Sequence, residues 1–290
     1  MNSDHQCGKV YLVGAGPGDP GLLTLKGCEV LKSCEVVIYD ALVNPALVEY
    51  VPPEAERIFI GHSRHHDRIT QAEVHRLMIE RARHGKVVVR LKGGDPFIFG
   101  RGGEEALALA EAGIEWEVVP GVSAGHAVPA YAGIPLTHRA YASSVAFVTG
   151  HECDGKRSPV AWDKLATAVD TLVVFMGAKN LPRLVAALLE AGRAPSTPVA
   201  VIEQGTHPDQ RVRVATLETV LDAVAEPPIG TPTLIVVGEV VSLSVQRSAF
   251  SLQPQANLVE MNNMASLVGD APLLRLESQR KLAERLMAER

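Results

Sequence analysis

The chain has 290 residues, of which 47% are hydrophobic and 21% charged, and its formal net charge is −5. Such a composition is typical of a globular protein that buries a sizeable core. The negative charge disfavours a general binder of nucleic acid or anionic membranes, because such proteins need a basic surplus. Four cysteines without a CxxC pair, an N-terminus without an apolar signal core and no apolar run of membrane-spanning length favour a cytoplasmic protein with reduced thiols.

The first part of the chain alternates short apolar runs with helical patterns. Strands are predicted at residues 9–13, 35–39, 57–60, 87–91 and 115–119. Helices are predicted at residues 22–33, 70–84 and 106–112, the second of which begins with a capping box of Thr70 and Glu73. Parallel sheets built from such alternation bury both faces, so this part reads as an α/β unit.

The second part continues in the same style. Strands are predicted at residues 144–149, 171–175, 198–202 and 233–237, with a further strand at 211–215 and a clear helix at 180–191. The predicted fold class is therefore α/β, with two α/β domains at residues 9–120 and 121–244. Residues 245–290 form a C-terminal extension, for which we expect a mobile segment and then a helix starting near Pro272. A disordered extension is the alternative.

A glycine-rich loop follows the first predicted strand, at residues 14–21. It invites a dinucleotide-binding interpretation, but the third glycine of that fingerprint would fall on Asp19, whose carboxylate would repel a pyrophosphate. Pro17 also removes an amide that could hold phosphate. A dinucleotide-dependent oxidoreductase is therefore the disfavoured alternative from another class of enzyme.

A second glycine-rich stretch follows the predicted strand at residues 87–91. Gly93 and Gly94 allow a sharp turn or the close approach of a ligand, and Asp95 places a carboxylate at the carboxyl end of the strand. Ligands of open α/β sheets bind at this edge. Arg101 adds a cation nearby. A ligand site is the favoured interpretation, and a glycine-rich connection with solvated charges is the alternative.

Other polar residues sit after predicted strands. Asp40 follows the second strand, where it can transfer a proton, bind a ligand or cap a turn. The third strand opens into a loop at residues 61–68 with three histidines and two arginines, whose spacing does not favour a metal site. This loop is either an anion-binding rim or an ordinary solvated loop.

Motifs at several separated places carry a resemblance to a known family. They lie at residues 13–19, 93–105, 120–124, 131–139, 148–151, 175–177, 204–206 and 233–238. Together they resemble the tetrapyrrole methylases and, within that family, the uroporphyrinogen-III C-methyltransferases. The Gly-Arg-Gly-Gly-Glu and Gly-Ile-Pro-Leu-Thr-His-Arg segments are the most specific of them.

The resemblance implies a cleft between two α/β domains and a homodimer. It implies transfer of methyl groups from S-adenosylmethionine to two ring carbons (C2 and C7) of uroporphyrinogen III, giving precorrin-2 and S-adenosylhomocysteine without a metal. A later precorrin methyltransferase is the alternative within the family. Because no iron- or dehydrogenase-type region precedes the methylase motifs, we expect the stand-alone enzyme.

The resemblance also assigns cofactor contacts. A carboxylate such as Asp95 suits the ammonium, sulfonium and ribose diol of S-adenosylmethionine, and Met176 can pack on its adenine ring. The small residues would let the backbone line the adenine slot. The full implied set is Pro17, Gly93, Gly94, Asp95, Ile98, Ser123, Ala124, Met176 and Gly205.

Substrate contacts follow from charge and from the resemblance together. A tetrapyrrole ringed by carboxylates needs a local cluster of cations on an acidic protein, and guanidinium grips carboxylate with two parallel hydrogen bonds. Arg101 and Arg139 are the best candidates, and Glu104 and His151 complete the expected substrate-binding set. Side chains of the 61–68 loop either add to this rim or are solvated: Arg64, His65, His66 and Arg68.

Catalytic roles come from the family pattern. Asp40 matches the position of the proposed proton acceptor, and Arg101 is expected to act on the ring. Where the family usually carries a proton-donating lysine, this chain has His62, whose charge depends on pH near neutrality. Either His62 fills that role or the lysine is dispensable.

Overall fold

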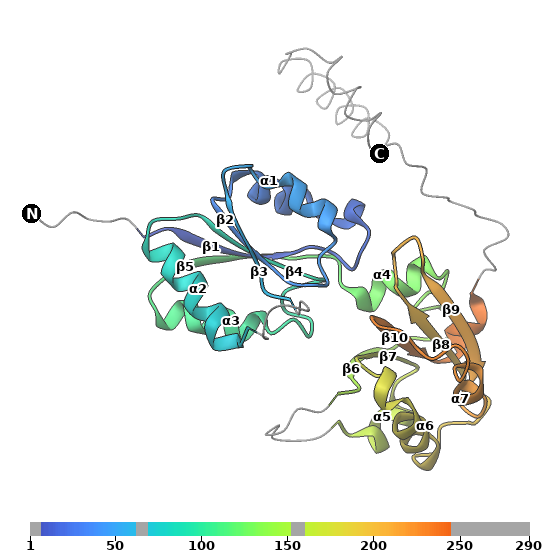
Figure 1. The fold of residues 1–290 in the computed structure, drawn as a ribbon. Helices are drawn as coiled ribbons and strands as arrows, with labels where there is room; N and C mark the ends of the chain where they lie inside the picture. Colours follow the sequence, from blue (N-terminus) through green and yellow to red (C-terminus); the bar gives the residue numbers. More distant parts are fainter. Residues whose placement is uncertain (1–6, 62–68, 152–159, 245–290) are drawn as a thin grey trace, which may run out of the picture. The chain divides into compact units, whose positions relative to one another are not determined.

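The computed structural model of the protein describes residues 7–61, 69–151 and 160–244. Two five-stranded sheets, each covered by helices, form this part of the chain (Figure 1). His62, the basic side chains at 64–68 and the expected tail helix lie outside the described residues. The predicted α/β fold class is confirmed.

The first sheet is parallel throughout, with the strand order β3-β2-β4-β1-β5. Its strands are β1 (Lys9–Gly14), β2 (Val36–Tyr39), β3 (Glu56–Phe59), β4 (Val88–Lys92) and β5 (Glu115–Val119). In the central pair, β1 and β4, the last residues of the two strands lie side by side, Gly14 beside Lys92. Loops that leave these strands therefore start from one edge of the sheet.

Helices cover both faces of this sheet (Figure 1). They are α1 (Leu25–Ser33) on one face, and α2 (Gln71–Arg83) and α3 (Gly102–Glu111) on the other. Since side chains alternate along a strand, Val89 and Leu91 of β4 face α1, whereas Val88 shares the α2 and α3 face with Arg90 and Lys92. Two charged residues of β4 thus point into an otherwise apolar layer.

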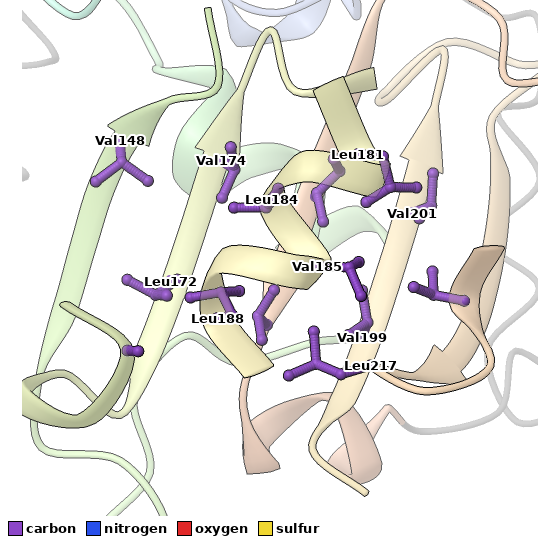
Figure 2. Close-up of a cluster of buried hydrophobic side chains, with 14 of the residues drawn as sticks. Val148, Leu172, Val174, Leu181, Leu184, Val185, Leu188, Val199, Val201 and Leu217 are labelled. Carbon is purple, nitrogen blue, oxygen red and sulfur yellow. The ribbon is translucent and has the colours of Figure 1, made fainter. Parts of the chain in front are cut away.

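The second sheet mixes parallel and antiparallel pairs in the order β6-β7-β10-β8-β9. Its strands are β6 (Val145–Thr149), β7 (Thr171–Phe175), β8 (Pro198–Glu203), β9 (Arg211–Thr216) and β10 (Thr233–Val237). The helices α5 (Trp162–Ala168), α6 (Leu181–Glu190) and α7 (Val220–Ala223) accompany it. Figure 2 shows Leu184 and Leu188 of α6 facing Leu172 and Val174 of β7, a dry layer that fixes the helix on the sheet.

The strand predictions match the observed strands within one or two residues, whereas several helix boundaries differ. Helix α1 begins at Leu25, because Pro20–Leu22 form a separate 3₁₀ turn, and α3 begins at Gly102 instead of residue 106. No helix was predicted between residues 122 and 132, yet this stretch contains α4 (Ala124–Tyr131). The expected domain boundary at residue 120 falls between β5 and α4, and the division itself stays a prediction.

Within the described ranges, no helix is long and apolar enough to cross a membrane.

Candidate active site

Three loops meet at the carboxyl edge of the first sheet. Gly16 and Gly94 exchange backbone hydrogen bonds, with N···O distances of 3.2 Å from Gly16 to Gly94 and 2.7 Å in return. A Cβ atom added to Gly14 would lie 2.4 Å from the Cα atom of Gly121. Side chains would force these loops apart, so the glycines are needed for the loops after β1, β4 and β5 to touch.

The Asp95 carboxylate ties two of these loops together. Its Oδ1 accepts a hydrogen bond from the Phe97 N–H at 2.8 Å, and its Oδ2 accepts one from the Gly121 N–H at 3.0 Å. The residue expected to bind a cationic ligand therefore also organises its own loop. Any ligand contact of Asp95 is additional to these two bonds.

Helix α4 begins at this edge and packs against the second sheet. Its first residue, Ala124, has its backbone nitrogen 3.8 Å from the Cβ position of Gly94, and Ser123 caps the helix by accepting from the Gly125 N–H at 3.2 Å. The Phe147 and Phe175 rings leave no room for a Cβ atom on Gly125. Val128 of α4 does the same for Gly205. Ser123, Ala124 and Gly205 thus lie on or against one helix.

Strained backbone gathers in the loops that leave β4, β7 and β8. Among the described residues, the non-glycine residues with positive φ angles are Phe99, Arg101, Met176, Gln204 and Thr206. Each such conformation costs about 1–3 kcal/mol and persists where surrounding structure enforces it, often at ligand sites. Met176 directly follows β7 and is 51% exposed. A large apolar side chain held open in this way is available to a ligand.

The remaining expected cofactor residues lie in the same loops. Pro17 follows the Gly16 bridge, and Ile98 is 38% exposed beside Phe99, whose ring centroid is 4.8 Å from that of Phe175. Backbone amides, small residues and exposed apolar side chains fit a nucleoside with a small cationic end better than they fit a polyphosphate. S-adenosylmethionine therefore suits this donor set. No group of three or more His, Cys, Asp or Glu side chains in the described ranges is arranged to hold a metal.

Asp40 lies at the same edge, directly after β2. Its Oδ1 accepts a hydrogen bond from the Leu42 N–H at 3.0 Å, and its Oδ2 lies 3.3 Å from Nη2 of Arg90. The side chain is 27% exposed, so a ligand can reach it. Its expected partner in proton transfer, His62, is outside the described residues.

Arg101 and Glu104 pair with each other at the start of α3. Arg101 donates from Nε to Glu104 Oε1 at 2.9 Å and from Nη2 to Oε2 at 2.7 Å. The guanidinium holds the pKa of the Glu104 carboxyl below its usual range. A substrate carboxylate that binds Arg101 must therefore compete with Glu104 for the guanidinium.

The other two expected substrate residues are exposed on loops beside the second sheet. Arg139 lies in the turn between α4 and β6, and His151 lies just after β6, where its N–H donates to Thr149 Oγ1 at 3.2 Å. The described contacts do not join either side chain to the Arg101–Glu104 pair.

The sequence interpretation missed a buried ionic cluster next to Asp40. It consists of Arg90, Lys92 and Glu105, which are 4%, 3% and 0% exposed. Two cations inside an apolar run were the available signal, because a buried charge needs a partner. It also missed a polar junction between the halves of the chain, where Tyr131 donates to Asp19 at 2.8 Å and the Asp19 N–H donates to Thr206 Oγ1 at 3.1 Å.

Comparison with known proteins agrees with this arrangement. Residues 9–221 match the family described as tetrapyrrole (corrin/porphyrin) methylases. A uroporphyrinogen-III C-methyltransferase of Priestia megaterium is 50% identical over 237 residues, which cover 82% of this chain and all of that protein. A siroheme synthase of Pseudomonas putida is 52% identical over 239 residues, and the chain spans only 51% of that longer protein.

A solved structure is similar as well. The uroporphyrin-III C-methyltransferase of Thermus thermophilus, crystallised with S-adenosyl homocysteine, has a TM-score of 0.70 and 42% identity, covering 81% of this chain and all of that one. Together with these relatives, the fold defines an α/β methyltransferase that depends on S-adenosylmethionine. The chain belongs to the tetrapyrrole methylase family.

Proposed function

We propose that the protein is an S-adenosylmethionine-dependent C-methyltransferase that methylates uroporphyrinogen III at C2 and C7, giving precorrin-2 for sirohaem, cobalamin or haem d1 synthesis. The observation that carries the proposal is the match to the Priestia protein over its whole length at 50% identity. The structure supports it too, because three of the signature segments, at residues 13–19, 93–105 and 120–124, meet at the carboxyl edge of the first sheet. A later precorrin methyltransferase shares this fold and is the alternative that the substrate test must exclude.

The nucleoside end of the cofactor is assigned to the loops around Gly94. S-adenosylmethionine supplies an electrophilic methyl group on its sulfonium. Asp95 would hold its own loop in place and attract the cationic end of the cofactor. The residues that would line the proposed site are Pro17, Gly93, Gly94, Ile98, Ser123, Ala124, Met176 and Gly205. Alignment of the acceptor carbon with the methyl group supplies much of the rate, since an electron-rich pyrrole carbon needs little further activation.

The tetrapyrrole is assigned to the side of Arg101. Arg101 would exchange its Glu104 partner for a substrate carboxylate. The released Glu104 carboxylate would then face solvent or accept a hydrogen bond from a pyrrole N–H. Arg139 and His151 are proposed to meet other carboxylates on the ring periphery. These roles are consistent with the exposed positions of all four side chains.

Asp40 is proposed to accept the proton that leaves after methylation. The carboxylate is held by the Leu42 N–H and by Arg90 and is still partly exposed. A positioned base contributes about 10²–10⁴-fold to a rate. His62 is proposed as the proton donor in place of the family lysine. The protein is further proposed to act as a cytoplasmic homodimer whose domains span residues 9–120 and 121–244.

Incubation with methyl-labelled S-adenosylmethionine tests the proposal. With uroporphyrinogen III as acceptor, we expect label in the tetrapyrrole and formation of S-adenosylhomocysteine. Folded protein that binds S-adenosylhomocysteine but labels only a precorrin, and not uroporphyrinogen III, would overturn the proposed substrate.

A further inference from the structure

Four charged side chains form a connected cluster beneath the carboxyl edge of the first sheet. Glu105 of α3 lies at the centre, with Oε1 3.0 Å from Nε of Arg90 and Oε2 2.8 Å from Nζ of Lys92. Arg90 reaches on to Asp40, with 3.3 Å between Nη2 and Oδ2. Gln71 of α2 adds a hydrogen bond to Glu105 Oε1 at 3.2 Å. The cluster thus links the buried α3 face of the sheet to Asp40.

The cluster is costly to the fold. Glu105 is fully buried and both cations are nearly so, and each ion taken out of water carries a penalty of several kcal/mol that its partners must offset. Burial and the neighbouring Arg90 charge lower the pKa of Lys92, which is the sign of such a penalty. Apolar residues of similar size would often serve stability as well. The cluster therefore calls for a role beyond packing.

The arginine in this cluster is fixed on every side. Besides Glu105 and Asp40, its Nη1 donates to two backbone carbonyls, Leu91 O at 2.9 Å and Ile38 O at 3.3 Å. These acceptors hold the guanidinium in one orientation, and Glu105 contributes to it by accepting from Nε. The group that reaches Asp40 is therefore positioned by a residue that does not itself touch Asp40.

We propose that Glu105 is a positioning residue for methyl transfer, which holds Arg90 so that Arg90 fixes the Asp40 carboxylate toward the substrate. This rests on the proposed function and on Asp40 as the proton acceptor. Arg90 and Lys92 together balance the charges of Glu105 and Asp40. Loss of the Glu105 charge removes the ionic partner of Arg90 at Nε, so of its described contacts only the Leu91 and Ile38 carbonyls then orient the guanidinium toward Asp40.

A double-mutant cycle tests the positioning role. Glu105→Gln keeps the shape of the side chain and removes its charge, and we expect kcat to fall about tenfold while the KM for S-adenosylmethionine and the affinity for S-adenosylhomocysteine stay within about twofold. In the Asp40→Asn background the same change should cost less than about twofold, because the group being positioned is already disabled. Arg90→Lys, which keeps the charge and loses the planar fork, should show the same pattern and serves if Glu105→Gln folds poorly.

Glu203→Gln is the matched control. Glu203 is also a buried glutamate held by arginine, with Oε2 2.7 Å from Nη2 of Arg213, but it belongs to the second sheet. Its effect should combine additively with Asp40→Asn. If the wild-type enzyme is active but the effects of Glu105→Gln and Arg90→Lys add to that of Asp40→Asn, the positioning role is wrong while the proposed function stands. Absence of methyl transfer by the wild type would instead overturn the proposed function and the inference with it.

Discussion

At the scale of single residues, Asp95 holds its loop through two backbone N–H groups, so its role in cofactor binding is tied to geometry as much as to charge. Asparagine would place an NH₂ group opposite one of these N–H donors. A buried or half-buried donor left without its acceptor costs about 1–3 kcal/mol. We therefore expect Asp95→Asn to weaken S-adenosylhomocysteine binding at least about tenfold in calorimetric titration. Asp163→Asn, at an exposed position of helix α5, is the control; equal affinities for Asp95→Asn and the wild type would contradict the assignment.

Arg101 makes a different prediction, because its fork is paired with Glu104 at the start of α3. Arg101→Lys keeps the positive charge and loses the second parallel hydrogen bond, a loss of about 1.5–3 kcal/mol for a charge-assisted contact. Steady-state kinetics should show kcat/KM for the tetrapyrrole reduced by about tenfold or more, with S-adenosylhomocysteine affinity nearly unchanged. If Arg101→Lys loses cofactor affinity as severely as Asp95→Asn, Arg101 does not belong to the substrate side.

The sequence located these residues better than it located their partners. Asp40, Asp95 and Arg101 stand out because each follows a strand or a glycine pair, which are local features. Glu105 and Arg90 did not stand out, since their significance depends on Asp40, which is far away along the chain. Two cations inside an apolar run indicate that a partner is needed, but which residue supplies it is visible only in the folded structure.

At the scale of elements, Asp170 fixes the start of β6. Its Oδ2 accepts from the backbone and the hydroxyl groups of Ser143 and Ser144, at distances from 2.8 to 3.1 Å. Hydrogen bonds from Ser144 and Ser143 hold the pKa of the Asp170 carboxyl below its usual range. A carboxyl whose pKa is lower in the folded state stabilises the fold above its unfolded pKa, about 3.9, and this contribution is lost as the pH falls through the folded value.

We therefore expect Asp170→Asn to lower the free energy of unfolding at neutral pH. Below about pH 4, where Asp170 of the wild type becomes protonated, the two proteins should differ less in this free energy. Urea denaturation of both proteins from about pH 7 to pH 3 measures this. A constant difference between the two proteins across that range would show that Asp170 does not carry the effect.

Helix α4 shows why one element escaped the sequence interpretation. It contains Gly125 and Pro129, which cost about 1 and 3 kcal/mol in a helix interior relative to alanine. Local propensity thus argued against a helix of only eight residues. Tertiary contacts decide otherwise: a Cβ on Gly125 would lie 2.9 Å from the rings of Phe147 and Phe175, so only glycine lets the helix approach the second sheet. Most of the strands, by contrast, are short apolar runs such as β2, β7 and β10, whose composition indicates that they are buried.

At the scale of the whole molecule, the two sheets contribute different residues to the proposed site. The parallel sheet supplies the glycine loops, Asp40 and the ionic cluster, whereas the mixed sheet supplies Met176 and the loop with Gly205. Tyr131, Asp19 and Thr206 join the two sides through two hydrogen bonds. We expect Tyr131→Phe, which removes the bond to Asp19, to weaken S-adenosylhomocysteine binding a few-fold, since one hydrogen bond contributes about 0.5–1.5 kcal/mol. Tyr141→Phe, on an exposed ring outside this junction, is the control in the same titration, and equal losses for both variants would contradict the prediction.

The identity of the product decides whether the protein methylates uroporphyrinogen III. Uroporphyrinogen III, incubated with ¹³C-methyl S-adenosylmethionine and the purified protein under reducing conditions, should yield a tetrapyrrole with two labelled methyl groups. Mass spectrometry counts the methyl groups and ¹³C NMR places them, and we expect them at C2 and C7. A product with no label, or with label only when an already methylated precorrin is supplied, would contradict the proposed function.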